Sequence, residues 1–139
     1  MELKFNIHDQ ENSEDAKLIL NGIRQFNDPY RTEDWRELTI TAKNGDGEIV
    51  AGLNGNTDWG WLFVKLLWVA EEARGHDIGT QLMKEAEDEA KLRGCHSAWL
   101  DTFSFQAKGF YEKLGYSSFG MLDDFPRGHQ RFFLRKKII

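Results

Sequence analysis

Hydrophobic positions recur with two different periods along the first third of the chain. Residues 3–8 alternate apolar and polar side chains, which predicts a first strand. After a helix-start signal at residues 12–15, apolar side chains recur at helical spacing instead, and Asn27-Asp28-Pro29 ends this helix. The segment 30–36 fits either a short second helix or a loop. The apolar positions of the predicted helix are Ala16, Ile19, Leu20, Ile23 and Phe26.

Three strands follow, with turn signals between them. Residues 35–43 and 48–53 are β-rich and flank Asn44-Gly45-Asp46-Gly47, a strong turn sequence. Asn54-Gly55-Asn56 predicts a second turn, which leads into a strand over residues 59–69. Because this last strand is apolar on both faces, we expect it at the centre of the sheet.

The second half of the chain alternates helices and strands. An amphipathic helix is predicted over residues 78–93, with Glu87–Lys91 and Glu89–Arg93 as ion pairs on its polar face. The remaining predictions are a strand at 96–102, a helix at 106–114, and strands at 116–121 and 130–136 joined by the loop 122–129. The order βα(α)βββαβαββ indicates an α/β (α+β) fold with helices on both faces of a mixed, mostly antiparallel sheet. The strand–helix–strand unit at 60–102 predicts one parallel pair.

Composition narrows the class of protein. The 139 residues fit one domain, and the net charge of −5 argues against a general nucleic-acid binder. The N-terminus lacks the apolar segment of a signal peptide, and the run 59–70 is too short to span a bilayer. Cys95 is the sole cysteine, so no internal disulfide is possible, and a small buried side chain is its expected role. We expect a cytoplasmic protein without a metal site.

The most informative stretch runs from Trp68 to Leu82, where an apolar strand passes through a glycine-containing turn into a helix. The first N–H groups of a helix have no partners within it, and the helix dipole favours negative charge there. Such a turn therefore predicts a phosphate-bearing ligand. The alternative is a tight strand-to-helix connection in which Gly75 and Gly79 serve geometry alone.

A second motif supports the first. The pattern Val69-x4-Arg74-Gly75-x2-Ile78-Gly79-x2-Leu82 is followed by a strand and then by Ala107-x2-Phe110-Tyr111-Glu112-Lys113-Leu114-Gly115-Tyr116. From Leu66 to Tyr116 this order and spacing resembles the GCN5-related N-acetyltransferases (GNAT). The resemblance implies an acetyl-CoA-dependent acyltransferase that acetylates a primary amine by direct transfer in a ternary complex. A small-molecule amine is favoured as the acceptor over a protein N-terminus or lysine.

The resemblance also implies site residues. The pyrophosphate signature falls on Arg74, Gly75, His76, Asp77, Ile78 and Gly79. Thr80 either adds a hydroxyl to the phosphate or is an ordinary first-turn residue. The pantetheine arm would pair with the backbone of Leu67, Trp68 and Val69, where a main-chain N–H could meet the thioester carbonyl.

Two positions depart from the family pattern. Asp77 stands where glycine is usual, and a carboxylate near a pyrophosphate is repulsive. Asp tolerates positive φ and is a good N-cap, so we expect its side chain to cap the helix and point away from the phosphates. Ser104 replaces an asparagine that often touches CoA, and it reaches less far.

Tyr111 matches the family tyrosine that faces the CoA sulfur, where a phenol can protonate the leaving thiolate. No general base stands out; Asp101, Glu71 and Glu72 are candidates. Acidic and aromatic residues of the first helical region and the late hairpin would suit a cationic amine. These residues are Asp28, Glu33, Asp34, Asp123, Asp124, Tyr30, Trp35, Phe103, Phe105 and Phe125.

Two alternatives remain open at this stage. One is a non-catalytic acyl-CoA-binding or sensing module, and the other is an acetyltransferase for protein N-termini or lysines. An exposed strand edge is compatible with a homodimer.

Overall fold

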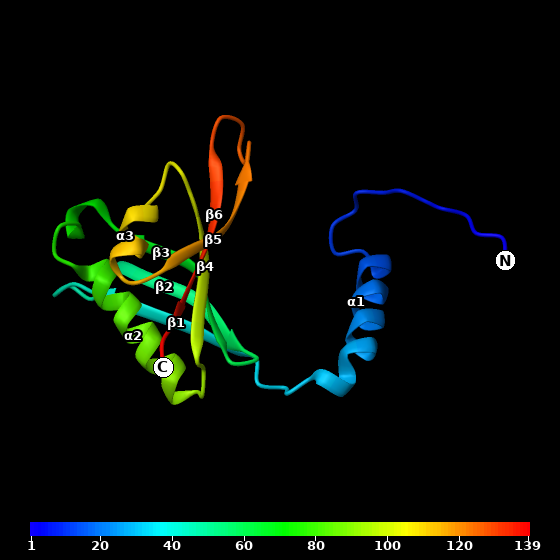
Figure 1. The fold of residues 1–139 in the computed structure, drawn as a ribbon, viewed down its shortest axis with the longest axis horizontal. Coiled ribbons are helices and arrows are strands. Elements are labelled where there is room, and N and C mark those ends of the chain that lie inside the picture. Colours follow the sequence, from blue (N-terminus) through cyan, green and yellow to red (C-terminus); the bar gives the residue numbers. More distant parts are fainter. The chain divides into compact units, whose positions relative to one another are not determined.

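A computed structural model describes all 139 residues and divides into two compact units, Met1–Glu33 and Asp34–Ile139 (Figure 1). The first unit contains α1 (Glu14–Asn27) and the 3-10 turn η1 (Asp28–Tyr30). Ser13 caps α1, since its Oγ accepts a hydrogen bond from the Ala16 N–H at 3.1 Å. The helix predicted here is confirmed, and it ends where Asn27-Asp28-Pro29 predicted.

The strand predicted over residues 3–8 is wrong, because these residues form no regular element. Their alternating pattern is suited to a half-buried strand, but the first unit contains no other strand that could supply ladder hydrogen bonds. The observed order therefore begins with a helix.

The second unit is built on a six-stranded sheet in the order β1-β2-β3-β4-β6-β5. Its elements are β1 (Arg36–Lys43), β2 (Ile49–Asp58), β3 (Trp61–Val69), η2 (Glu71–Ala73), α2 (Ile78–Leu92), β4 (Ser97–Phe103), α3 (Lys108–Lys113), β5 (Ser117–Asp123) and β6 (Gln130–Lys137). All neighbours are antiparallel except β3 and β4, which are parallel. The predicted mixed sheet and its single parallel pair are confirmed.

The core lies between this sheet and α2, which packs across β1, β2 and β3 (Figure 1). The largest fully buried side chains are Leu62, Met83, Leu100 and Leu134, from α2 and three adjacent strands. On the opposite face of the sheet, Phe63 of β3 stacks on Trp99 of β4 with ring centroids 4.2 Å apart. The central position predicted for the third strand of the meander follows from this burial on both faces.

A β-bulge replaces the turn that Asn54-Gly55-Asn56 predicted. Strand β2 continues to Asp58, its register against β3 shifts between Asn54 and Gly55, and the chain reverses at Trp59-Gly60. A Cβ at Gly55 would collide with the backbone carbonyl oxygen of Phe63. The glycine therefore permits a close approach of two strands, which is a second common use of glycine beside a turn. No helix has the combination of length and apolar character that a membrane span requires.

Candidate active site

A cavity of about 680 Å³ opens between the end of β3, the start of α2 and the helix α3. It brings together ten of the twelve site residues predicted from the sequence. Lining this cavity are Leu67, Trp68, Val69, Ala73, Arg74, Gly75, Asp77, Ile78, Gly79, Thr80, Ala107, Phe110, Tyr111, Lys113 and Leu114.

The parallel ladder between β3 and β4 stops before either strand ends. Pairing runs from Trp61↔Ser97 to Val64↔Leu100, while β3 continues to Val69 and β4 to Phe103. From Leu66 to Val69 the backbone of β3 is paired with β2 but has no β4 partner. Unpaired N–H and C=O groups therefore face the region where a pantetheine arm is expected to pair.

The loop from η2 to α2 is held by Arg74, whose Nε donates to the carbonyl oxygen of Val69 at 3.2 Å. This bond braces the loop against the end of β3. Gly75 has φ +83° and Asp77 has φ +56°, so two left-handed residues turn the chain into the helix. The expected positive φ of Asp77 is confirmed.

The expected N-cap bond of Asp77 is wrong, because its side chain makes no cap hydrogen bond to α2. A left-handed backbone directs the side chain differently from the extended backbone of an ordinary N-cap residue. The first N–H groups of α2 are consequently left without a side-chain partner beside the cavity.

Two tyrosines next to each other in the core have opposite environments. The Tyr111 ring stands edge-on to the Tyr116 ring with centroids 6.2 Å apart. Tyr116 donates its hydroxyl to Oε2 of Glu87 at 2.9 Å, whereas the Tyr111 hydroxyl has no hydrogen-bond partner in the protein. Burial and the negative charge of Asp101 raise the pKa of Tyr111. Tyr111 is thus a protonated phenol that lines the cavity and whose hydroxyl has no partner in the protein.

Glu87 contradicts its predicted place on the polar face of α2. It is only 9% exposed, and besides Tyr116 it accepts a hydrogen bond from Nζ of Lys136 at 2.8 Å. Two strong donors offset the cost of burying this carboxylate, so it turns inward and does not pair with Lys91. The other predicted pair, Glu89–Arg93, forms at 2.7 Å. Helical periodicity could not reveal the buried trio, because its members are far apart in the sequence.

Comparison with known proteins agrees with this geometry. The family model described as the acetyltransferase (GNAT) family matches residues 6–116. The chain belongs to the GNAT acetyltransferase family.

Named relatives are also acetyltransferases. Acetyltransferase Atu2258 of Agrobacterium fabrum is 35% identical over 136 residues, covering 97% of this chain and 99% of the relative. Blasticidin-S acetyltransferase of Streptomyces morookaense is 40% identical over 93 residues, covering 66% of this chain and 68% of the relative. The crystal structure of an acetyltransferase from Bacillus cereus superposes with a TM-score of 0.84 at 34% identity, covering 94% of this chain and 97% of that one.

Gly79 of the GNAT signature has a packing role. A Cβ at this position would lie 3.3 Å from the Phe110 ring and 3.9 Å from a methyl group of Val69. The absence of a side chain thus lets α2 approach α3 closely.

Two predicted cofactor contacts do not line the cavity. His76 lies in the loop outside its lining, and Ser104 lies between β4 and α3. The Ser104 Oγ accepts from the Gln130 N–H at 3.0 Å and contacts Nδ1 of His129 at 3.1 Å. Lys113, in contrast, lines the cavity and has no ion-pair partner, while Lys108 sits over the Phe132 ring.

The candidate bases differ in their partners. Asp101 accepts a hydrogen bond from Nε of Arg131 at 2.9 Å, and Glu71 and Glu72 are exposed residues of η2. None of the three carboxylates lines the cavity.

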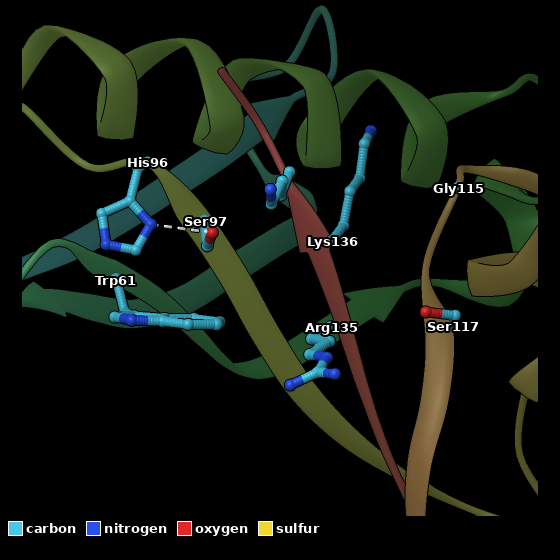
Figure 2. Close-up of a pocket in the computed structure, with 8 residues that line it drawn as sticks. Trp61, His96, Ser97, Gly115, Ser117, Arg135 and Lys136 are labelled. Carbon is cyan, nitrogen blue, oxygen red and sulfur yellow. Dashed lines mark hydrogen bonds between the residues drawn. The ribbon is translucent and has the colours of Figure 1, made fainter.

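A second cavity of about 450 Å³ lies at the other end of β3 and β4 (Figure 2). Trp61 and Ser97, the first residues of those strands, line it, and Nδ1 of His96 lies 2.9 Å from the Ser97 Oγ. Lys136 reaches away toward α2, where it meets Glu87 (Figure 2). This cavity contains no predicted site residue, so the first cavity is the candidate active site.

Proposed function

We propose that this GNAT protein is a cytoplasmic enzyme that transfers an acetyl group from acetyl-CoA to a primary amine of a small molecule, directly and within a ternary complex. The observation that carries the proposal is that Tyr111, whose hydroxyl has no partner in the protein, lines the same cavity as the uncapped N-terminus of α2. The similarity to blasticidin-S acetyltransferase, which is named for an antibiotic, supports a small molecule as the acceptor.

The residues fit the donor substrate. The N–H groups of Ile78, Gly79 and Thr80 begin a 15-residue helix and would hold the diphosphate, with the ammonium of Lys113 at the same cavity. The unpaired backbone of β3 at Leu67–Val69 would pair with the amides of the pantetheine arm. Arg74 fixes the loop between these two parts through Val69.

The chemistry follows from this arrangement. The neutral amine attacks the thioester carbonyl, a C–N bond forms, and the C–S bond breaks. The thiolate takes the Tyr111 proton and leaves as the thiol. The nitrogen loses its extra proton to solvent, and solvent returns a proton to the Tyr111 phenolate. A phenol whose pKa is raised stays protonated at neutral pH and so remains ready to serve as the acid.

Two measurements test this function. Acetyl-CoA should raise the midpoint of thermal unfolding, because a ligand that binds only the folded state stabilises it. Thiol release across a panel of small amines, with a peptide N-terminus and a lysine peptide as comparisons, should show turnover on small acceptors. Stabilisation without thiol release on any acceptor would favour the non-catalytic binding module, and the absence of stabilisation would reject the proposal.

A further inference from the structure

Arg131, near the start of β6, is fixed along one edge of its guanidinium. Its Nε donates to Oδ1 of Asp101 at 2.9 Å, and its two Nη atoms make no hydrogen bond within the protein. Its Cζ lies 5.4, 5.0 and 5.2 Å from the ring centroids of Phe103, Phe125 and Phe133. A guanidinium held in this way presents a planar pair of donors in one direction, which is the geometry that binds a carboxylate.

The surroundings of this cation favour an anion. The Arg131 side chain is 28% exposed and that of Asp101 is 16% exposed, so the three rings exclude much of the water. A charge–charge contact is worth more in such a site than at a fully hydrated surface. The sequence grouped Phe103 and Phe125 with acidic residues for a cationic acceptor, but the structure places both rings around a guanidinium.

The Arg131–Asp101 pair lies near the end of the β3–β4 ladder, where an acceptor could approach the thioester. Asp101 is the first residue of β4 beyond Leu100, where the ladder with β3 stops. It shares a face of β4 with Trp99, because side chains alternate along a strand. Asp101 therefore lies at the point where β3 and β4 separate, beside the β3 segment that is expected to pair with the pantetheine arm.

A second cation lies across the same opening. Lys65 follows Val64, the last β3 residue paired with β4, and stands unpaired at the register shift between β3 and β2. Lys65 is exposed and has no ion-pair partner. The separation of β3 and β4 thus begins at Lys65 on the β3 side and at Asp101, with its partner Arg131, on the β4 side.

We propose that Arg131, assisted by Lys65, binds a carboxylate of the acceptor, so that the preferred substrates are primary amines that also carry a carboxylate. Asp101 is a positioning residue, which orients the guanidinium. This inference rests on the proposed acetyl transfer and specifies its substrate class. The competing explanation is that Arg131 only ties β6 to β4.

Matched acceptors separate the two explanations. The probes are γ-aminobutyrate and L-phenylalanine, each compared with its own amide, so that only the carboxylate changes. Wild type, Arg131→Gln, Arg131→Lys and Arg135→Gln are assayed for kcat and KM with saturating acetyl-CoA. Arg135 is the matched control, because it lies four residues further on the same face of β6, over Phe119 and away from Asp101.

Wild type should prefer at least one acid over its amide. Arg131→Gln should raise KM for that acid about tenfold or more, the size expected for losing a hydrogen-bonded charge pair. In Arg131→Gln, the KM for the amide should change by less than about twofold. Arg131→Lys should retain part of the preference for the acid over the amide, and Arg135→Gln should have the same preference as wild type. The kcat/KM of the acid divided by that of its amide is compared between variants, because differences in the intrinsic reactivity of the two acceptors cancel in this comparison.

The inference is overturned if Arg131→Gln impairs acid and amide equally, or if wild type does not favour the acid. Turnover of neutral amines without an acid preference would refute this inference and leave the proposed function intact. If no acceptor is turned over, calorimetric titration of the CoA-loaded protein decides. Equal binding of acid and amide to wild type would then overturn the inference.

Discussion

The hydroxyl of Tyr116 is bound to Glu87 at 2.9 Å, while the hydroxyl of Tyr111, whose ring stands 6.2 Å away, is bound to nothing in the protein. The same side chain thus has two roles in one core. Tyr116 contributes a satisfied polar contact, and Tyr111 keeps a proton available at a cavity.

Replacing Tyr111 with phenylalanine should lower kcat without weakening acetyl-CoA binding. Loss of a general acid typically costs about 10²–10⁴-fold in rate. The measurement is steady-state turnover beside the dissociation constant of acetyl-CoA, which should stay within about twofold. Because the pKa of Tyr111 is raised above its ordinary value of 10.0, ionisation of this phenol should not reduce turnover below that pH. Unchanged turnover in the variant would reject the catalytic role.

Tyr116→Phe should instead cost stability. The lost bond reaches a carboxylate, so unfolding free energy should fall by about 1.5–3 kcal/mol, measured by urea denaturation. Turnover of the folded fraction should be affected far less than in Tyr111→Phe. If both variants lose stability equally, the contrast between the two hydroxyls is wrong.

The hydrogen bond between Tyr116 and Glu87 also makes the stability of the fold depend on pH. Burial, followed by the charge and hydrogen bond of Glu87, raises the pKa of Tyr116 above 10.0. Above that pH the unfolded chain releases this proton while the native chain retains it, so the native state loses stability as pH rises. Below pH 10 the contribution is fully present. The fall in wild-type stability above pH 10 should therefore be shallower in Tyr116→Phe.

Asp77→Asn should strengthen acetyl-CoA binding. The carboxylate makes no cap bond, so its removal leaves stability within about 0.5 kcal/mol while it relieves repulsion of the diphosphate. A gain of about threefold to tenfold is expected at low salt, and it should shrink as salt screens the charge. Asp46→Asn, in the exposed turn between β1 and β2, is the control for net charge. Weaker binding by Asp77→Asn would mean that the carboxylate holds the loop.

Gly55→Ala should be severely destabilising. The new methyl group collides with the Phe63 carbonyl, and neither backbone can move without breaking the ladder. A loss above about 2 kcal/mol is expected by thermal or urea unfolding. Gly45→Ala places its methyl group in open space and serves as the control. A neutral Gly55→Ala would show that the bulge can shift.

Local sequence patterns predicted the second half of the fold well, because strands and helices there are short, regular and separated by clear end signals. The prediction of secondary structure failed where hydrogen-bonded pairing between strands decides the structure. The pattern at residues 3–8 cannot reveal that a partner strand is missing, and Asn54-Gly55-Asn56 has the same letters in a bulge as in a turn.

The site shows the same division. A contiguous motif from Arg74 to Gly79 predicted the loop, and the left-handed Asp77 agreed with it. The contacts of Glu87 with Tyr116 and Lys136, and of Asp101 with Arg131, join residues 29 to 49 positions apart, and no local pattern connects them.

The early end of the β3–β4 ladder has a thermodynamic consequence. The amides of Leu66 to Val69 on that side lack the protection that a neighbouring strand provides, so this seam is a weak point of the empty protein. An amide-bearing arm that filled the seam would act as an additional strand and slow hydrogen exchange along it. The donor substrate would then complete the architecture of the sheet, and the fold would gain rigidity at the moment when it becomes able to react.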